Sequence, residues 1–181
     1  MEQAAPSSTK VAIKWSLIYV LTGIVITYII EISKLDINSS IKYLGYIPLI
    51  AFLLLAQKEY KDQHGGYISF GEGFATGFKY GLFAGLLFGV FMYLYLAFLS
   101  PEVMVKILDV QKDAMVAKGA PSDQIEKTTE FMNRFGAIAI SFGTAIWYII
   151  LGVILALIGA AIFKKEHSAF DTEPTNIDPT V

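Results

Sequence analysis

Five glycines recur at steps of four residues in the apolar stretch between Ser69 and Leu99. They are Gly73, Gly77, Gly81, Gly85 and Gly89. In a water-soluble helix each of them would cost about 1 kcal/mol relative to alanine. In a membrane the same spacing is favourable, because residues without side chains let a second helix backbone come close. The pattern therefore predicts a membrane-spanning helix with a closely packed neighbour.

The composition agrees with a membrane location. Of the 181 residues, 55% are hydrophobic and 17% are charged, whereas soluble domains average about 25% charged residues. The net charge of -2 argues against a nucleic-acid partner, which needs a basic surface. The chain has no cysteine, which excludes disulfides, thiolate nucleophiles and cysteine-ligated metals.

The apolar runs predict an all-α fold, a polytopic membrane protein built as a bundle of four transmembrane helices. The first run, Trp15 to Ile30, ends in bulky residues, so we interpret it as a retained span and not as a cleaved signal peptide. The second run is the weakest, because it is short and contains Lys42 and Pro48; a re-entrant or interfacial hairpin is the alternative. The predicted spans are 13–32, 41–57, 70–99 and 135–163, within a membrane domain at 13–165.

The polar segments have different expected structures. Residues 1–12 form a polar N-terminal segment, residues 58–67 a loop, and residues 166–181 a disordered tail. Residues 101–134 form a helical excursion between the third and fourth spans, with Pro101 at a helix start and a turn at 119–121. We expect this excursion to lie against the membrane surface or against the bundle.

Two patterns describe how the third span begins and packs. Ser69 and Glu72 match a capping box, S-x-x-E, directly before the long apolar run. Each step of four turns the helix by about 400°, so the five glycines spiral over about 160° and predict an oblique partner. The fourth span offers small residues on one face, so we predict that the third and fourth spans are antiparallel neighbours. These residues are Ala137, Ser141, Ala145, Gly152, Ala156 and Ala160. A homodimer through the third span is the competing interpretation.

Lysine and arginine near the span ends favour an orientation with both termini in the cytoplasm. Lys79 lies opposite the centre of the glycine stripe and is a functional candidate as an intramembrane lysine, although snorkelling to the interface is the simpler interpretation. Tyr148 lies on the small-residue face of the fourth span, either as a packing residue or as a substrate-lining one. His64 and His167 have no neighbouring ligands at metal spacing. We therefore predict no metal, no cofactor and no catalytic residue.

The order of the spans, and the stretch Ile68-Ser69-Phe70-Gly71-Glu72-Gly73-Phe74 followed by Gly77, resemble an uncharacterised family of bacterial membrane proteins, domain of unknown function 4199. The resemblance covers about residues 10 to 165. It implies a four-span protein of the bacterial cytoplasmic (inner) membrane. It implies no activity, ligand or catalytic residue.

The sequence therefore predicts a non-enzymatic membrane protein that acts through helix–helix association, as an accessory or oligomerising component. Its expected partners are the lipid bilayer and either a second copy or another membrane protein. A small transporter or channel subunit is the alternative, although four spans with few polar residues offer a poor solute pathway. An intramembrane enzyme ranks third, because no acid–base pair is evident.

Overall fold

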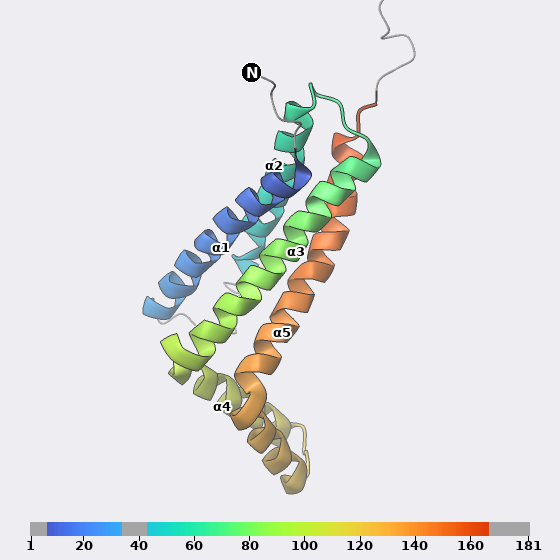
Figure 1. Cartoon of the computed structure of the whole chain (residues 1–181). Coiled ribbons are helices and arrows are strands. Elements are labelled where there is room, and N and C mark those ends of the chain that lie inside the picture. Colours follow the sequence, from blue (N-terminus) through green and yellow to red (C-terminus); the bar gives the residue numbers. More distant parts are fainter. Residues whose placement is uncertain (1–6, 34–42, 167–181) are drawn as a thin grey trace, which may run out of the picture.

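The computed structural model describes residues 7–33 and 43–166, and all of its regular elements there are helices (Figure 1). The predictions for residues 1–6, for the tail from 167 and for Lys42 lie outside the described residues. The elements are α1 (Ser8–Ile32), α2 (Tyr46–Gln63), α3 (Phe70–Leu94), the π-helix η2 (Tyr95–Leu99), α4 (Pro101–Ala117) and α5 (Ser122–Phe163).

Consecutive bundle helices run in opposite directions, and contacts between their ends fix this arrangement. At the upper end of Figure 1, Lys14 near the start of α1 forms an ion pair with Glu59 near the end of α2. At the same end, Ile68 before α3 forms an isolated backbone bridge with Lys165 after α5, with N–O distances of 2.9 Å. The chain therefore enters and leaves the bundle at this upper end.

Three helices are long and apolar enough to cross a membrane: α1, α3 continued by η2, and α5. Their outer faces carry many exposed aliphatic side chains, which is the surface that lipid requires. These helices indicate a membrane protein. The third of the predicted spans, 70–99, coincides with α3 and η2, which together run over Phe70–Leu99.

The predicted second span at 41–57 differs from α2 at both ends. The helix begins at Tyr46 and continues to Gln63, through residues that were expected to form a loop. Helix-favouring charged residues carry it on, and Lys58 pairs with Asp62 one turn later. The helix ends before Gly65 and Gly66, which have positive φ. Only its first part is apolar, so α2 is not among the three helices that could cross a membrane.

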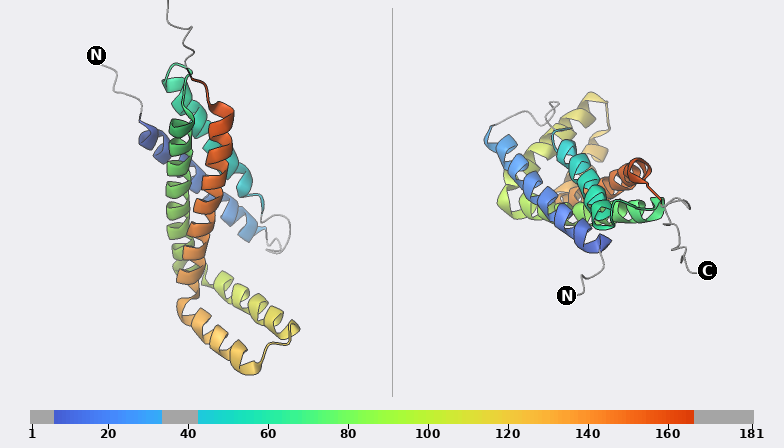
Figure 2. Two further views of the ribbon diagram at one scale, coloured as in Figure 1. Left: turned by 90° about the vertical axis from the view of Figure 1, so that its right-hand side faces the viewer. Right: turned by 90° about the horizontal axis from the view of Figure 1, so that it is seen from above.

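The excursion is a hairpin that projects from the lower end of the bundle (Figure 2). It consists of α4 and the first part of α5, joined by a turn in which Gly119 has φ +70°. The fourth span was expected to begin near residue 135, but α5 is one helix of 42 residues. Measured along its axis at 1.5 Å per residue it is about 63 Å long, roughly twice the thickness of the hydrocarbon core. It bends where the hairpin leaves the bundle (Figure 2).

Candidate functional site

The glycine stripe of α3 lies directly against α5. A Cβ atom added to Gly81 would lie 2.8 Å from the Cα of Gly152, so the two backbones touch. Added Cβ atoms on the other four glycines would lie between 2.7 and 3.3 Å from α5. The nearest α5 residues are Ala160 for Gly73, Ala156 for Gly77, Ala145 for Gly85 and Ala145 for Gly89. Because α5 covers this face, the glycines are not free to form a dimer with a second α3.

The remaining small residues of the predicted face lie near the lower end of this contact. The backbone oxygen of Ser141 would be 3.2 Å from a Cβ on Gly89, and the Ser141 hydroxyl donates to the carbonyl of Ala137 at 2.6 Å. Ala137 packs at the margin of the buried core. All eleven residues predicted for helix packing therefore lie on, or at the lower margin of, the seam between α3 and α5.

A buried glutamine that sequence reasoning did not single out joins three helices. The Nε2 atom of Gln57, on α2, donates to the carbonyls of Gly73 on α3 and Ala156 on α5, both at 3.0 Å. Its side chain is completely buried, and the glycines at 77 and 159 leave room for it. In the sequence, Gln57 is a single amide at the end of an apolar run. In a membrane such an amide is an interhelical hydrogen-bonding group, so this pattern could have predicted its role.

Lys79, the first of the two candidates for chemistry, has a structural partner. Lys79 extends to the start of α1, where its ammonium donates to the hydroxyl of Ser8 at 2.7 Å. Its neighbour on the helix, Glu72, accepts bonds from the backbone N–H and hydroxyl of Ser69, at 2.9 and 2.7 Å, which completes the capping box. The ammonium group of Lys79 therefore reaches the end of the bundle, as the snorkelling interpretation predicts.

Tyr148 lies in an aromatic cluster in the middle of the bundle. Its ring centroid is 5.3 Å from that of Phe88, 5.9 Å from that of Tyr19 and 6.1 Å from that of Tyr46. The contact with Tyr46 also shows that α2 begins near the middle of α5. Tyr148 therefore has the contacts of a packing residue.

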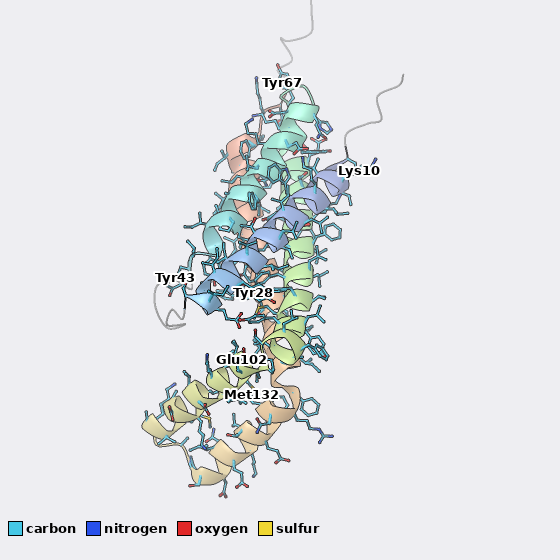
Figure 3. The ribbon with its side chains drawn as sticks, turned by 90° about the vertical axis from the view of Figure 1, so that its left-hand side faces the viewer. Lys10, Tyr28, Tyr43, Tyr67, Glu102 and Met132 are labelled. Carbon is cyan, nitrogen blue, oxygen red and sulfur yellow. The ribbon has the colours of Figure 1, made fainter. Side chains whose placement is uncertain are left out.

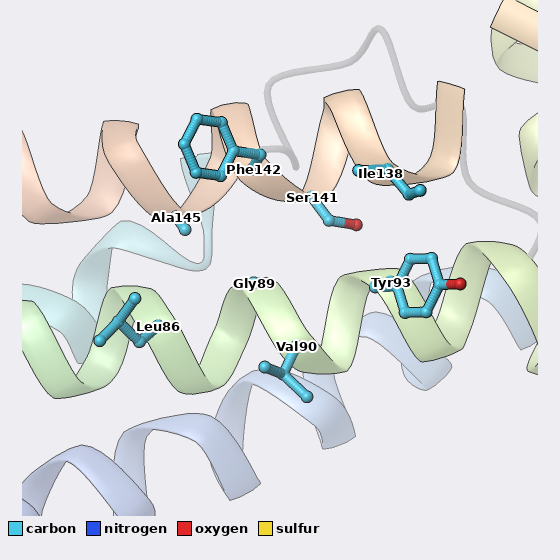
Figure 4. A pocket seen from close by; sticks show the side chains of 8 residues that line it. All are labelled: Leu86, Gly89, Val90, Tyr93, Ile138, Ser141, Phe142 and Ala145. Atoms are coloured by element: carbon cyan, nitrogen blue, oxygen red, sulfur yellow. The ribbon is translucent and has the colours of Figure 1, made fainter. Parts of the chain in front are cut away.

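An apolar groove opens on the outer face of α3 and α5, just below the closest contact (Figure 4). Its volume is about 380 Å³. The position four residues beyond Gly89 is Tyr93, whose ring is too large for the seam, so the glycine stripe ends here. The floor consists of small residues and the walls of large ones. The floor residues are Gly89, Ser141 and Ala145, and the wall residues are Leu86, Val90, Tyr93, Ile138 and Phe142.

One side of α5 continues from the seam past this groove into the hairpin. Its residues recur at alternating steps of four and three, which is heptad spacing. The upper four contact the glycines of α3 and are Ala145, Ile149, Gly152 and Ala156. The lower four stand uncovered. They are Phe131, Phe135, Ile138 and Phe142, with exposed fractions of 54%, 42%, 55% and 68%. We call these four residues the α5 stripe.

The sequence model of one protein family, described as a protein of unknown function (DUF4199), matches residues 14–165. The chain belongs to the DUF4199 family. The match includes the glycine seam, the groove and the whole hairpin. Comparisons with curated proteins and with solved structures find no match.

The charged groups of this DUF4199 protein gather at the two ends of its bundle. At the upper end Glu59 also accepts from the indole of Trp15 at 2.7 Å, and burial, followed by the charge of Glu72, raises the pKa of Tyr60. At the lower end Glu31 accepts from the hydroxyl of Ser100 at 2.6 Å. Among the described residues, no group of three or more His, Asp or Glu side chains could hold a metal ion.

Proposed function

We propose that this DUF4199 protein is a non-enzymatic membrane protein that works by helix–helix association, and that its associating surface is the α5 stripe with the adjoining groove. The observation that carries the proposal is the uncovered lower half of a heptad pattern whose upper half is already a helix–helix contact. On α5, the residues of the upper half of this pattern pack against α3, whereas the residues of the lower half are exposed.

The position of the stripe favours a protein partner over lipid alone. Ile138 and Phe142 lie in the apolar part of α5, where lipid could cover them. Phe131 lies in the hairpin between Glu130 and Arg134, where charged neighbours indicate water. A lipid tail cannot cover both parts of a stripe that crosses the membrane boundary, but a second helix can.

We propose a second copy of this chain as the partner. Copies inserted in the same orientation are related by a two-fold axis along the membrane normal, so the stripe of one α5 would face the same residues of the other. Phe142 has the most exposed ring of the stripe and stands beside the small floor of the groove. Each copy could therefore place its Phe142 ring in the groove of the other, which makes the surface self-complementary.

The proposed topology has four crossings with both termini in the cytoplasm of a bacterial inner membrane. The return of the chain to the upper end supports an even number of crossings, because α1 and α3 run downward while α2 and α5 run upward (Figure 1). In this topology the apolar first part of α2 provides the second crossing. Lys10, Lys14, Lys164 and Lys165 gather at the upper end, which favours the cytoplasmic side.

Cysteine cross-linking in native membranes tests the dimer, because the chain has no cysteine of its own. Single cysteines at Phe131 and Phe142 should form a disulfide-linked dimer under mild oxidation. Matched cysteines at Glu130 and Gly143, each one residue away on another face, should cross-link far less. Equal cross-linking at all four positions, or a monomer in lipid nanodiscs, would contradict the proposal.

The transporter alternative predicts a different result in the same membranes. Specific flux into proteoliposomes that is lost on changing Lys79 or Tyr148 would favour a transporter. Unchanged flux together with a cross-linked dimer would support association as the function.

A further inference from the structure

Helix α4 packs against the hairpin along one face and carries charged residues and an apolar strip on its other sides, and two further valines, Val105 and Val116, are exposed outside these groups. The face that packs against the first part of α5 contains Met104, Leu108 and Met115. The charged face of the helix is exposed. The charged residues are Glu102, Lys106, Asp109 and Asp113. The remaining face is a narrow apolar strip of small aliphatic residues at helical spacing. This α4 strip consists of Val103, Ile107, Val110, Ala114 and Ala117.

The α4 strip begins as a contact with the bundle and then continues without cover. Val103 and Ile107 pack against the buried core, whereas Val110 is 48% exposed and Ala114 and Ala117 are exposed. Since residues on one helical face point in the same direction, the uncovered part of the strip faces the same side as the part that touches the bundle. Figure 3 shows α4 on the side of the hairpin nearer the bundle, with the first part of α5 on the farther side.

The level at which α4 leaves the bundle coincides with the ends of two spans. Ser100, directly before α4, is bonded to Glu31 near the end of α1, and η2 ends at Leu99. The rings of Tyr28 and Tyr95 meet one turn above, at a centroid distance of 6.0 Å, and tyrosine is enriched at membrane–water boundaries. The α4 strip therefore leaves the bundle at the boundary of the membrane, on its membrane side.

From this geometry we propose that α4 is an interfacial helix, and that the occupant of its uncovered strip is the lipid surface of the membrane that the bundle crosses. The strip contains only valine and alanine beyond Ile107, without the aromatic anchors of a protein-binding surface such as the α5 stripe. Its charged face adjoins the strip on one side, about 90° around the helix, so α4 is amphipathic. The strip is also continuous with a contact already made, so no rotation of the hairpin is needed.

Lipid contact would give the hairpin a fixed depth. α4 would rest in the headgroup boundary, and the first part of α5 would be held in water beneath it. The α4 strip and the α5 stripe are on different helices, so this inference does not depend on the proposed dimer.

Spin labels at four single cysteines test the inference in the full chain. Val110 and Ala114 belong to the strip, and Asp109 and Asp113 are their immediate neighbours on the charged face. All four side chains are exposed, so labelling them should leave the fold intact. The labelled protein is reconstituted in vesicles of phosphatidylethanolamine and phosphatidylglycerol, and collisions with oxygen and with a water-soluble nickel chelate are measured.

We expect the collision ratio to shift towards oxygen at Val110 and Ala114 and towards the nickel chelate at Asp109 and Asp113. Equal ratios at all four positions would place α4 in water and overturn the inference. Protection of the strip from both reagents, with dipolar broadening between labels, would identify a second copy as the occupant and would also overturn it. Unchanged tryptophan fluorescence of each labelled protein confirms that the bundle is intact.

Discussion

The upper and lower halves of α5 carry one heptad pattern but have different neighbours. In the upper half, Gly152 lies in backbone contact with Gly81 of α3. In the lower half, Phe142 stands beside an open groove and is 68% exposed. The difference follows from α3, which presents glycine at steps of four as far as Gly89 and tyrosine at position 93. A regular pattern on one helix is therefore not sufficient for contact, because the facing helix decides where the backbones can approach.

The two halves also differ in how they are supported by α2. This helix begins near the level of Tyr148 and covers only the upper half, where Gln57 bonds to both α3 and α5. The lower half is held by α1, by η2 and by the first turns of α4. The upper half is thus a three-helix contact closed by hydrogen bonds, and the lower half is where the proposed dimer contact lies.

The largest expected effect comes from filling the upper seam. Gly81→Leu would place a side chain where the Cα of Gly152 lies, and backbone cannot move aside as a side chain can. We expect a loss of about 3 kcal/mol or more in the free energy of unfolding. The measurement is reversible unfolding in detergent micelles, followed by tryptophan fluorescence.

Gly143→Leu is the matched control in the lower half, because nothing lies within 4 Å of a Cβ added there. It should change the stability by less than about 0.5 kcal/mol. A similar loss for both variants would mean that glycine content, and not close packing, sets the stability, and the contrast between the halves would fail.

Much of this seam could be predicted from the sequence, because it depends on regular spacing. The regular spacing of the glycines, and of the small residues from Ala145 to Ala160, is sufficient to predict that they pack against each other. The capping box is equally local, since the side chains of Ser69 and Glu72 bond to residues only three positions apart in the chain. Local and periodic features of this kind need no knowledge of the rest of the fold.

Features set by tertiary context could not be predicted in the same way. The helix α2 extends through Lys58 to Gln63 because pairs one turn apart support it, whereas its composition was typical of a loop. The role of Gln57 depends on two carbonyls from distant helices. The extent of the uncovered α5 stripe depends on α3, which contacts only the upper half of the pattern. In each case the deciding neighbour is far away in the sequence.

An intermediate effect is expected from removing the hydrogen bonds that Gln57 adds to the upper half. Gln57→Leu keeps the size of the side chain but loses both donors, and we expect a loss of about 1–2 kcal/mol. Gln63→Leu on the same helix is the control, because that amide is exposed and bonds only to Glu59 one turn away. Thermal unfolding of both variants in lipid nanodiscs measures the difference. Equal midpoints would show that the buried bonds do not hold the three helices together.

The smallest effect is expected at the lower end, from Ser100→Ala. This change removes the 2.6 Å hydrogen bond to Glu31, which joins the end of α1 to the start of α4. Because Glu31 is only partly buried, water can replace the lost donor, and the cost should be about 1 kcal/mol or less. Hydrogen exchange should nevertheless increase locally, in η2 and the first turn of α4, because the lost bond holds to α1 the residue whose backbone N–H closes the π-helical turn onto Tyr95 at 2.8 Å. Glu31→Gln keeps an acceptor for the hydroxyl and should show less of this increase. If Ser100→Ala instead raised exchange throughout the glycine seam, the two halves of the bundle would open as one unit, and the separation between a closed upper half and an accessible lower half would not hold.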